Sequence, residues 1–227
     1  MDKAPEREHT WCVIPLFNEA TVVGEVISAL RETYPLVVAV DDGSVDGSAD
    51  AARAAGAAVV CHPYNMGQGA ALKTGIDYAL RDPEMRQVVT FDADGQHQVS
   101  DVVEMVAAMR KEGVDVVLGS RFLSGKTKPG LLKKIILRAA TAYTNLTTGV
   151  RLTDAHNGLR VLSRHACETI TIEQNRMAHA SEIISEIGRH NLSVREHPVH
   201  ILYTDYSRAK GQPMINAVNI VIDSIFR

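Results

Sequence analysis

The chain has 227 residues, 45% of them hydrophobic and 22% charged, which suits one large folded domain with a sizeable core. A formal net charge of -3 argues against a protein that coats nucleic acid, and we expect no nucleic-acid partner. The charged N-terminal segment and the lack of a long apolar stretch predict neither a signal peptide nor a transmembrane helix. Three widely spaced cysteines fit a reducing compartment, so we expect a cytoplasmic protein.

Short apolar runs alternate with helical patterns along the chain. The runs are rich in β-branched residues, which predicts an α/β fold with a Rossmann-like, mostly parallel sheet and helices on both faces. Strands are expected at residues 11–17, 36–40, 57–61, 87–91, 115–119 and 193–197, with mixed turn and strand signals at 153–163. Helices are expected at residues 20–32, 49–55, 69–80, 99–111, 130–147, 180–190 and 215–226. We expect a single domain over residues 1–227.

The sharpest motif places Asp92 and Asp94 directly after one expected strand, at the end of the sheet where ligands bind in such folds. Burying two adjacent carboxylates is costly unless a cation neutralises them. Carboxylate oxygens suit Mg2+ or Mn2+, so we expect a metal site at Asp92, Asp94 and Gln96, with His97 in support. The alternative is a solvated turn whose aspartates cap the next helix.

Two more strand ends carry polar motifs. Asp42 could accept hydrogen bonds from a base or ribose, although an ordinary Asp-Gly turn explains this motif taken alone. Asn65 and Gly67 precede a helix that contains Lys73 one turn on, and glycines at such a position let the backbone approach an anion. Glycines at a helix start are also often structural, and this motif is not a P-loop because no Gly-Lys-Ser/Thr ending follows.

Taken in order, seven motifs resemble those of the inverting family 2 glycosyltransferases with a GT-A fold. They are most similar to the branch that contains dolichol-phosphate mannose synthase and bacterial polyprenyl-phosphate sugar transferases. The motifs are VIPLFNE, VDDGSVDGS, NMGQGAA, FDADGQH, GSRF, TDAHNGLR and YSRAKGQ.

The resemblance implies a role for each matching position. Residues 1–119 would form the nucleotide-binding half and residues 120–227 the acceptor-binding half. The nucleoside pocket would be lined by Pro15, Phe17, Glu19, Val40 and Asp42. The diphosphate and its metal would be bound by Asp92, Ala93, Asp94 and Gln96. The sugar phosphates or the acceptor would meet Arg121, the reacting centre would lie near Asp154, and a loop closing over the nucleotide would carry Arg208.

The implied reaction is transfer of a hexose from a UDP- or GDP-sugar, with inversion, while Mg2+ or Mn2+ neutralises the leaving diphosphate. A hydroxyl acceptor needs a general base, for which Asp154 is the candidate, whereas a lipid phosphate is already anionic. Between Arg121 and Thr153 there is no acidic residue, but there are several basic ones: Arg121, Lys126, Lys128, Lys133, Lys134, Arg138 and Arg151. This stretch suits a helix that lies on an anionic membrane surface, or an ordinary amphipathic helix with a solvated basic face.

Several readings stay open. The first is a polyprenyl-phosphate glycosyltransferase, peripheral on the inner face of the cell membrane, with or without a small membrane partner protein. The second is a family 2 enzyme that acts on a glycan or small-molecule hydroxyl, and the third is a non-catalytic nucleotide-sugar-binding scaffold. The apolar segment 215–226 could pack on the sheet, form a homodimer or touch lipid. The sugar and the base cannot be read from the sequence.

Overall fold

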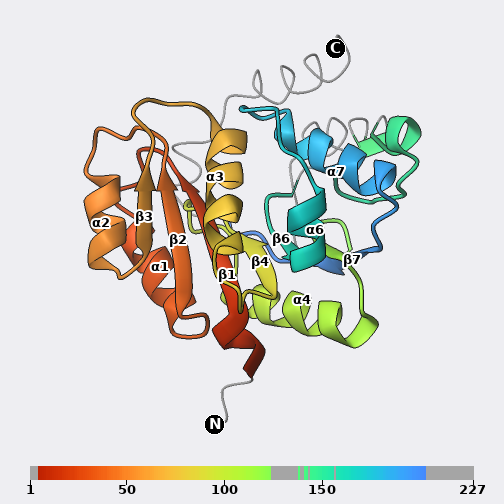
Figure 1. Ribbon diagram of the computed structural model, residues 1–227, viewed down its shortest axis with the longest axis horizontal. Coiled ribbons are helices and arrows are strands. Elements are labelled where there is room, and N and C mark those ends of the chain that lie inside the picture. Colours follow the sequence, from red (N-terminus) through yellow and green to blue (C-terminus); the bar gives the residue numbers. More distant parts are fainter. Residues whose placement is uncertain (1–4, 124–137, 139–140, 143, 156, 203–227) are drawn as a thin grey trace.

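The computed structural model describes residues 5–123, 138, 141–142, 144–155 and 157–202. Its centre is one sheet with the strand order β3-β2-β1-β4-β6-β5-β7 (Figure 1). The strands are β1 (Thr10–Leu16), β2 (Leu36–Asp41), β3 (Ala58–Cys61), β4 (Gln87–Thr90), β5 (Val116–Ser120), β6 (Arg160–Ser163) and β7 (Val194–Pro198). The helices are η1 (Pro5–His9), α1 (Val23–Arg31), α2 (Ser48–Ala54), α3 (Gln68–Leu80), α4 (Val99–Glu112), α6 (Arg164–Thr169) and α7 (His179–Arg189), and residues 144–148 are also helical.

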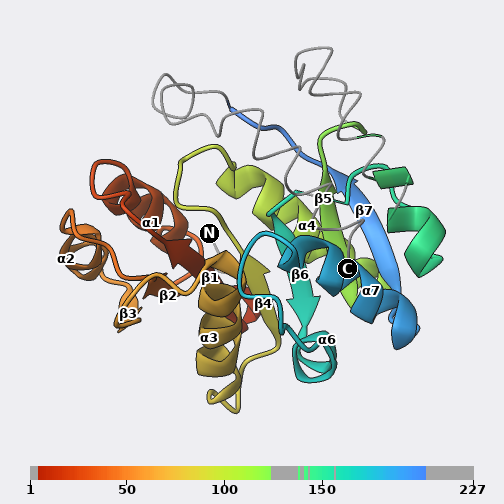
Figure 2. The same cartoon turned by 90° about the horizontal axis from the view of Figure 1, so that it is seen from above.

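Helices cover both faces of the sheet. Figure 2 shows α1 and α4 on one side and α3, α6 and α7 on the other. Alternate residues of β1 enter the two cores, since Cys12 and Ile14 pack on the α1 side and Val13 packs on the α3 side. Both sets are buried, so the strands read as continuous apolar runs.

The predicted mostly parallel α/β fold is confirmed, and all six expected strands are present. The seventh strand, β6, separates β4 from β5 and runs antiparallel to both. Its neighbouring residues Val161 and Leu162 are buried on opposite faces, so this short strand shows no alternation of apolar and polar residues. The short helix α6 was also missed. The expected helix at 215–226 lies outside the described residues.

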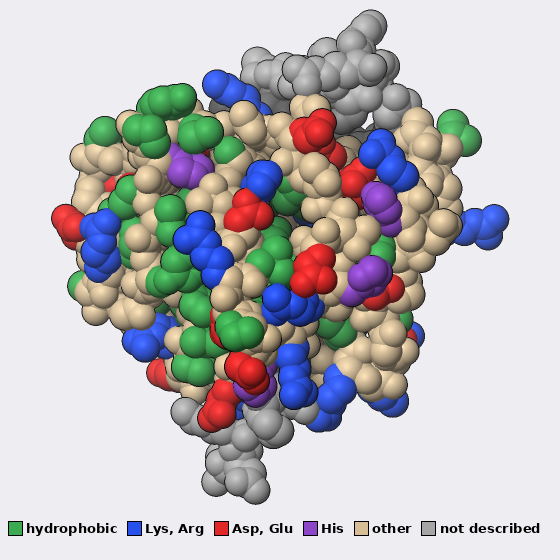
Figure 3. All heavy atoms as spheres, viewed as in Figure 1, with side chains coloured by type: hydrophobic (Ala, Val, Ile, Leu, Met, Phe, Trp, Pro, Cys, Tyr) green, Lys and Arg blue, Asp and Glu red, His purple; other side chains and the backbone are tan. Residues whose placement is uncertain are grey.

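The face that carries α3, α6 and α7 has both positive and negative side chains. Figure 3 shows acidic and basic side chains interspersed over these helices, with hydrophobic side chains gathered over α3 and β3. Within the described parts of the chain, no helix combines the length and the apolar character that crossing a membrane requires.

Helix α3 packs closely on the sheet because Gly75 has no side chain. A Cβ at this position would clash with Cγ1 of Val13 and lie 3.3 Å from Cγ2 of Val40. We therefore expect Gly75→Ala to lower the free energy of unfolding by about 1–3 kcal/mol, because the helix must move off a packed core. Urea denaturation followed by circular dichroism measures this change.

Gly24 provides the matched control for this prediction. It also lies in a helix, α1, but a Cβ there would meet no atom within 4 Å. Gly24→Ala should raise the free energy of unfolding by about 0.5–1 kcal/mol, because alanine favours the helix. Equal effects of the two substitutions would contradict the close approach at Gly75.

Candidate active site at the carboxyl ends of the strands

The loops that follow β1 and β2 are joined by hydrogen bonds. The amide of Asn18 donates to Oγ of Ser44 at 2.9 Å, and the amide of Val45 donates to Oδ1 of Asn18 at 3.1 Å. The amide of Glu19 donates to Oγ of Ser48 at 2.8 Å. Asn18 adopts a positive φ of 53°, which asparagine tolerates. These bonds hold together the two loops at the edge of the sheet where the predicted nucleoside-binding residues lie.

The predicted nucleoside-binding residues meet at this edge. Pro15 of β1 and Val40 of β2 are partners in the parallel register, and Asp42 directly follows β2. The side chain of Phe17 is 43% exposed, which leaves its ring available to a ligand. The sheet therefore brings together four residues that the sequence separates by up to 27 positions. Their contact with a nucleoside stays a prediction.

Asp42 is buried and holds the loop before α3. Its carboxylate accepts hydrogen bonds from the amides of Met66 at 2.8 Å and Gly67 at 2.7 Å, and it lies 2.7 Å from Nδ1 of His62. Both carboxylate oxygens are thus already engaged within the protein. A bond from Asp42 to a base or ribose would have to share one of them.

The start of α3 differs from the expected anion site. The amide of Gly67 donates to Asp42, and the amides of Gly69 and Ala70 donate to the carbonyl of Asn175, at 2.8 and 3.2 Å. These amides are therefore not free to bind a phosphate, and the glycines instead permit close packing on residues 174–175. Lys73 lies on the exposed side of α3 and pairs with Asp77 at 2.6 Å.

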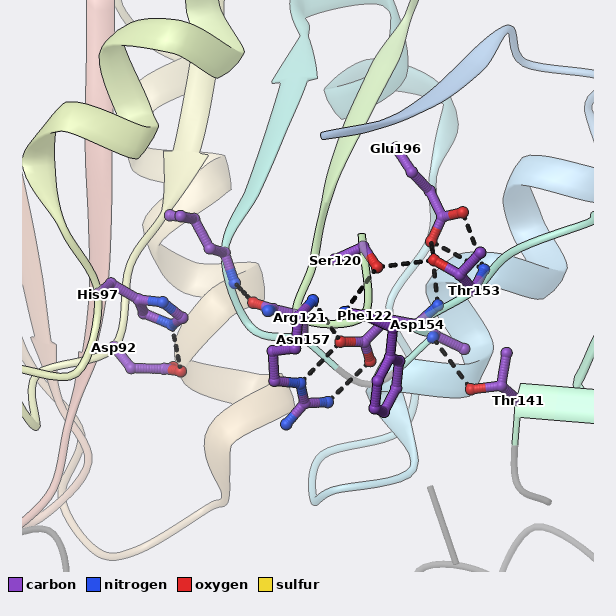
Figure 4. Close-up of polar contacts among 12 residues, drawn as sticks. Asp92, His97, Ser120, Arg121, Phe122, Thr141, Thr153, Asp154, Asn157 and Glu196 are labelled. Atoms are coloured by element: carbon purple, nitrogen blue, oxygen red, sulfur yellow. Dashed lines mark hydrogen bonds and ion pairs between the residues drawn. The ribbon is translucent and has the colours of Figure 1, made fainter. Parts of the chain in front are cut away.

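Asp92 and Asp94 follow β4, as expected. Asp92 lies 3.0 Å from Nε2 of His97 and accepts a hydrogen bond from the side chain of Gln68 at 3.1 Å. Among the described residues, Asp94 accepts one bond, from the amide of Gln96 at 3.0 Å. Figure 4 shows His97 directed at Asp92, which agrees with its expected supporting role.

The two carboxylates differ in their electrostatic surroundings. Burial would raise the pKa of Asp92, but the hydrogen bond from His97 and the charge of Arg160 outweigh burial and lower it. Burial and the neighbouring charge of Asp92 raise the pKa of Asp94 to about 6, although the bond from Gln96 acts in the opposite direction. Asp94 is therefore mostly ionised at neutral pH, but at an energetic cost that a nearby positive charge would offset.

The donor atoms at this position fit a hard divalent cation. Mg2+ and Mn2+ prefer carboxylate oxygens and retain positions for phosphate oxygens. No group of three His, Cys, Asp or Glu side chains capable of holding a metal occurs in the described part of the chain. Asp92 and Asp94 would therefore need further oxygen ligands, from the predicted ligand Gln96 or from a bound diphosphate, to complete the coordination.

A second cluster lies beyond β5. Arg121 donates two parallel hydrogen bonds to Asp154, from Nε and from one terminal nitrogen, both at 2.7 Å (Figure 4). The Asp154 side chain is only 1% exposed, so this ion pair is largely desolvated. Glu196 of β7 positions the loop: it accepts bonds from the amide of Thr153 at 2.8 Å and that of Asp154 at 3.0 Å. These bonds hold the guanidinium of Arg121 in a fixed orientation.

Arg160, Glu196 and His179 are residues that the sequence reasoning missed as site residues. Arg160 is 2% exposed, and the charges of Asp92 and Asp154 both act on it. Burial lowers its pKa to about 10, so the guanidinium stays charged. An arginine at the start of the apolar run RVL is the signal that could have identified it. Glu196 and His179 had no comparable signal in the sequence.

Some predicted features lie outside the described residues or away from this site. Arg208 and the lysines of the basic stretch are not described, whereas Arg121, Arg138 and Arg151 are. A hollow of about 650 Å³ lies between residues 144–148 and α7, and its lining includes none of the predicted site residues.

Asp94 makes the stability of the fold depend on pH. Its pKa is about 6 in the folded protein against an ordinary value of 3.8, so the stability that its protonated form provides is lost as the pH rises through 6. We expect Asp94→Asn, in EDTA at pH 7.5, to raise the free energy of unfolding by on the order of 1–3 kcal/mol. Urea denaturation at pH 4 and at pH 7.5 measures the difference, which should be small at pH 4.

Asp50→Asn is the control, because Asp50 is exposed and makes only a surface ion pair with Arg53. It should change stability little at either pH. An Asp94→Asn variant that is less stable than the natural protein at pH 7.5 in EDTA would overturn the electrostatic description of this position.

This chain is similar to known proteins over most of its length. Residues 11–171 match the family model described as glycosyl transferase family 2. An uncharacterized protein of Methanocaldococcus jannaschii is 36% identical over 97% of this chain and 93% of its own length. A UDP-N-acetylglucosamine–dolichyl-phosphate N-acetylglucosaminyltransferase of Methanococcus voltae is 27% identical over 88% of each chain. An undecaprenyl-phosphate mannosyltransferase of Micrococcus luteus is 29% identical over 71% of this chain and 69% of its own.

A solved structure agrees on the fold. Glucosyl-3-phosphoglycerate synthase from Mycobacterium tuberculosis, in complex with Mn2+, UDP-glucose and phosphoglyceric acid, superposes with a TM-score of 0.74. It is 18% identical and covers 97% of this chain and 79% of that chain. The predicted GT-A fold is confirmed.

Proposed function

This chain belongs to glycosyl transferase family 2, and from that premise we propose that it moves a hexose from a UDP- or GDP-sugar to a polyprenyl phosphate at a membrane surface. The donor would lie along the ends of β1, β2 and β4, with its diphosphate at Asp92 and Asp94. Two relatives whose names include dolichyl phosphate or undecaprenyl phosphate support this class of acceptor.

The hydrogen bonding of Asp154 is the observation that favours a phosphate over a hydroxyl as the acceptor. Both of its carboxylate oxygens accept hydrogen bonds from Arg121. Taking up the proton of a hydroxyl would neutralise Asp154 and leave the guanidinium of Arg121 without its partner charge, which costs about 3–5 kcal/mol. A phosphate monoester is ionised at neutral pH and needs no base. Asp154 is therefore assigned the task of orienting Arg121, and Arg121 that of binding an anionic acceptor or the donor phosphates.

The proposed reaction then balances without a proton transfer. The bond between the anomeric carbon and the donor diphosphate breaks, and its electron pair leaves with the diphosphate. An oxygen of the acceptor phosphate forms the new bond from the opposite face, which inverts the anomeric carbon. Mg2+ or Mn2+, when bound, would supply positive charge to the leaving diphosphate. Asp92 and Asp94 would hold this ion, and Arg121 would bind phosphate oxygens through guanidinium hydrogens other than the two that bond to Asp154.

The membrane part of the proposal rests on the basic stretch that begins at Arg121. In the described residues, the guanidinium of Arg138 lies 5.8 Å from the centre of the Phe122 ring. This contact places one basic residue of the stretch beside the Arg121 cluster. Positive side chains at this position would attract anionic headgroups and the phosphate of a lipid acceptor.

An acceptor assay tests the proposal. Radiolabelled UDP-glucose, UDP-N-acetylglucosamine and GDP-mannose are each incubated with Mn2+ and either undecaprenyl phosphate or dolichyl phosphate in liposomes. We expect label from one donor to move into the organic phase in a metal-dependent way. Asp94→Asn should lower the rate at least about a hundredfold, because a carboxylate that would hold the metal ion on the diphosphate is lost, whereas Asp50→Asn should not change it.

The other readings predict different outcomes of the same assay. Transfer only to a soluble acceptor, such as glucose or 3-phosphoglycerate, would show a hydroxyl-directed enzyme. Tight binding of a nucleotide sugar without any transfer would indicate a scaffold. Either result would refute the lipid acceptor.

A further inference from the structure

Gly158 lies in the loop before β6, and its main-chain conformation does not call for glycine. The described glycines with a positive φ, the conformation that favours glycine, are Gly43, Gly47, Gly56, Gly67, Gly95, Gly113 and Gly149, and Gly158 is not among them. The reason for a glycine at residue 158 therefore lies in the space around its Cα.

That space is occupied by the carboxyl group of Asp92. A Cβ on Gly158 would clash with Oδ2 of Asp92 and lie 3.0 Å from both its Cγ and its Oδ1. A methyl group at residue 158 does not fit unless this carboxyl group moves. The backbone of Gly158 is thus in direct contact with a predicted metal ligand.

The carboxylate of Asp92 is held from two other directions. Its Oδ1 accepts a hydrogen bond from Nε2 of Gln68 at 3.1 Å, and its Oδ2 lies 3.0 Å from Nε2 of His97 (Figure 4). The His97 side chain is 4% exposed, and its ring packs edge-to-face on that of Phe91, with 5.4 Å between the ring centres. One orientation of the carboxylate satisfies all of these neighbours.

Gly158 is held in place as well. Oγ1 of Thr90, the last residue of β4, donates a hydrogen bond to the carbonyl oxygen of Gly158 at 2.6 Å. The amide of Leu159 donates to Oδ1 of Asn157 at 2.9 Å, which fixes the turn around Gly158. Because Asp92 follows Thr90 by two positions, the end of β4 holds both the carboxylate and the backbone on which the carboxylate lies.

We propose that Gly158 is a positioning residue of the metal site, where the lack of a side chain lets Asp92 take the orientation in which it binds a divalent cation together with the donor diphosphate. This inference rests on the proposed function, which places the cation and the diphosphate at Asp92 and Asp94. A methyl group at residue 158 would turn the carboxylate away, because the terminal torsion of an aspartate rotates more easily than the backbone moves.

A glycine required only for packing behaves differently, and Gly188 of α7 is the matched control. A Cβ there would lie 2.5 Å from the carbonyl oxygen of Thr148, which is a backbone atom, and none of its nearest atoms belongs to the candidate active site. Gly188→Ala should therefore lower the urea midpoint of unfolding and leave the Mn2+ affinity of the folded protein unchanged.

The first test is calorimetric titration of Mn2+ into the protein saturated with UDP or with GDP, using the nucleotide that tightens Mn2+ binding to the natural protein. Gly158→Ala should weaken Mn2+ binding about 10–100-fold, the usual effect of altering a residue that orients a metal ligand. Circular dichroism of the same samples should show an unchanged helix and strand content.

The second test identifies Asp92 as the group that is displaced. Asp92→Ala removes the carboxylate and leaves room for a Cβ at residue 158. Gly158→Ala should lower the urea midpoint of the natural protein but not that of Asp92→Ala, since contacting residues are not additive. An equal fall in both backgrounds would overturn the inference, even where Gly158→Ala alone is too poorly folded for calorimetry.

Failure of this inference can be distinguished from failure of the proposed function. If a nucleotide tightens Mn2+ binding to the natural protein and Gly158→Ala binds Mn2+ equally well, the role of Gly158 is refuted and the proposed function stands. If neither nucleotide changes the Mn2+ affinity of the natural protein, the metal site of the proposed function and the role of Gly158 are both refuted.

Discussion

The proximity of two carboxylates at the end of β4 is the constraint on which the rest of the site depends. Asp92 and Asp94 are two positions apart, on a segment that the central strand holds in place. Like charges at this distance are unfavourable, and the protein compensates for only one of them. His97 and Gln68 contact Asp92, whereas Asp94 retains a pKa raised to about 6. The fold thus leaves at Asp94 a negative charge that a bound cation would balance.

Two arginines, the buried Arg160 and the partly exposed Arg121, face carboxylates of this site. Arg160 lies close enough to Asp92 and Asp154 for both charges to act on it, and Arg121 pairs directly with Asp154. The positive charge of Arg160 therefore acts on two carboxylates. The guanidinium of Arg121 is held at the edge of the site in a defined orientation. A buried pair of this kind contributes little net stability, so its value lies in orientation. Glu196 and Thr153 keep the supporting loop in place.

The sequence predicted the parts of this structure that depend on local pattern. The apolar runs of β1, β2 and β4 are long and buried on both faces, so they were identified together with the polar residues that end them. Strand β6 was not separated from the mixed turn and strand signals at residues 153–163, because four residues without alternation do not show a period. The sequence could not show whether Asp42 and Gly67 bind a ligand or only stabilise the fold. The hydrogen bond from the amide of Gly67 to the carboxylate of Asp42 joins two loops that are distant in the sequence. The capping of α3 by the carbonyl of Asn175 is equally non-local.

The central claim is that Asp92 and Asp94 hold a divalent cation together with a diphosphate. Titration of Mn2+ into the protein with and without saturating UDP or GDP tests it most directly. Two carboxylates alone leave the ion mostly hydrated, so the account predicts Mn2+ binding at least about tenfold tighter with one of the nucleotides, and loss of this coupling in Asp94→Asn. Mn2+ affinity that neither nucleotide changes, or a coupling that persists in Asp94→Asn, would contradict it.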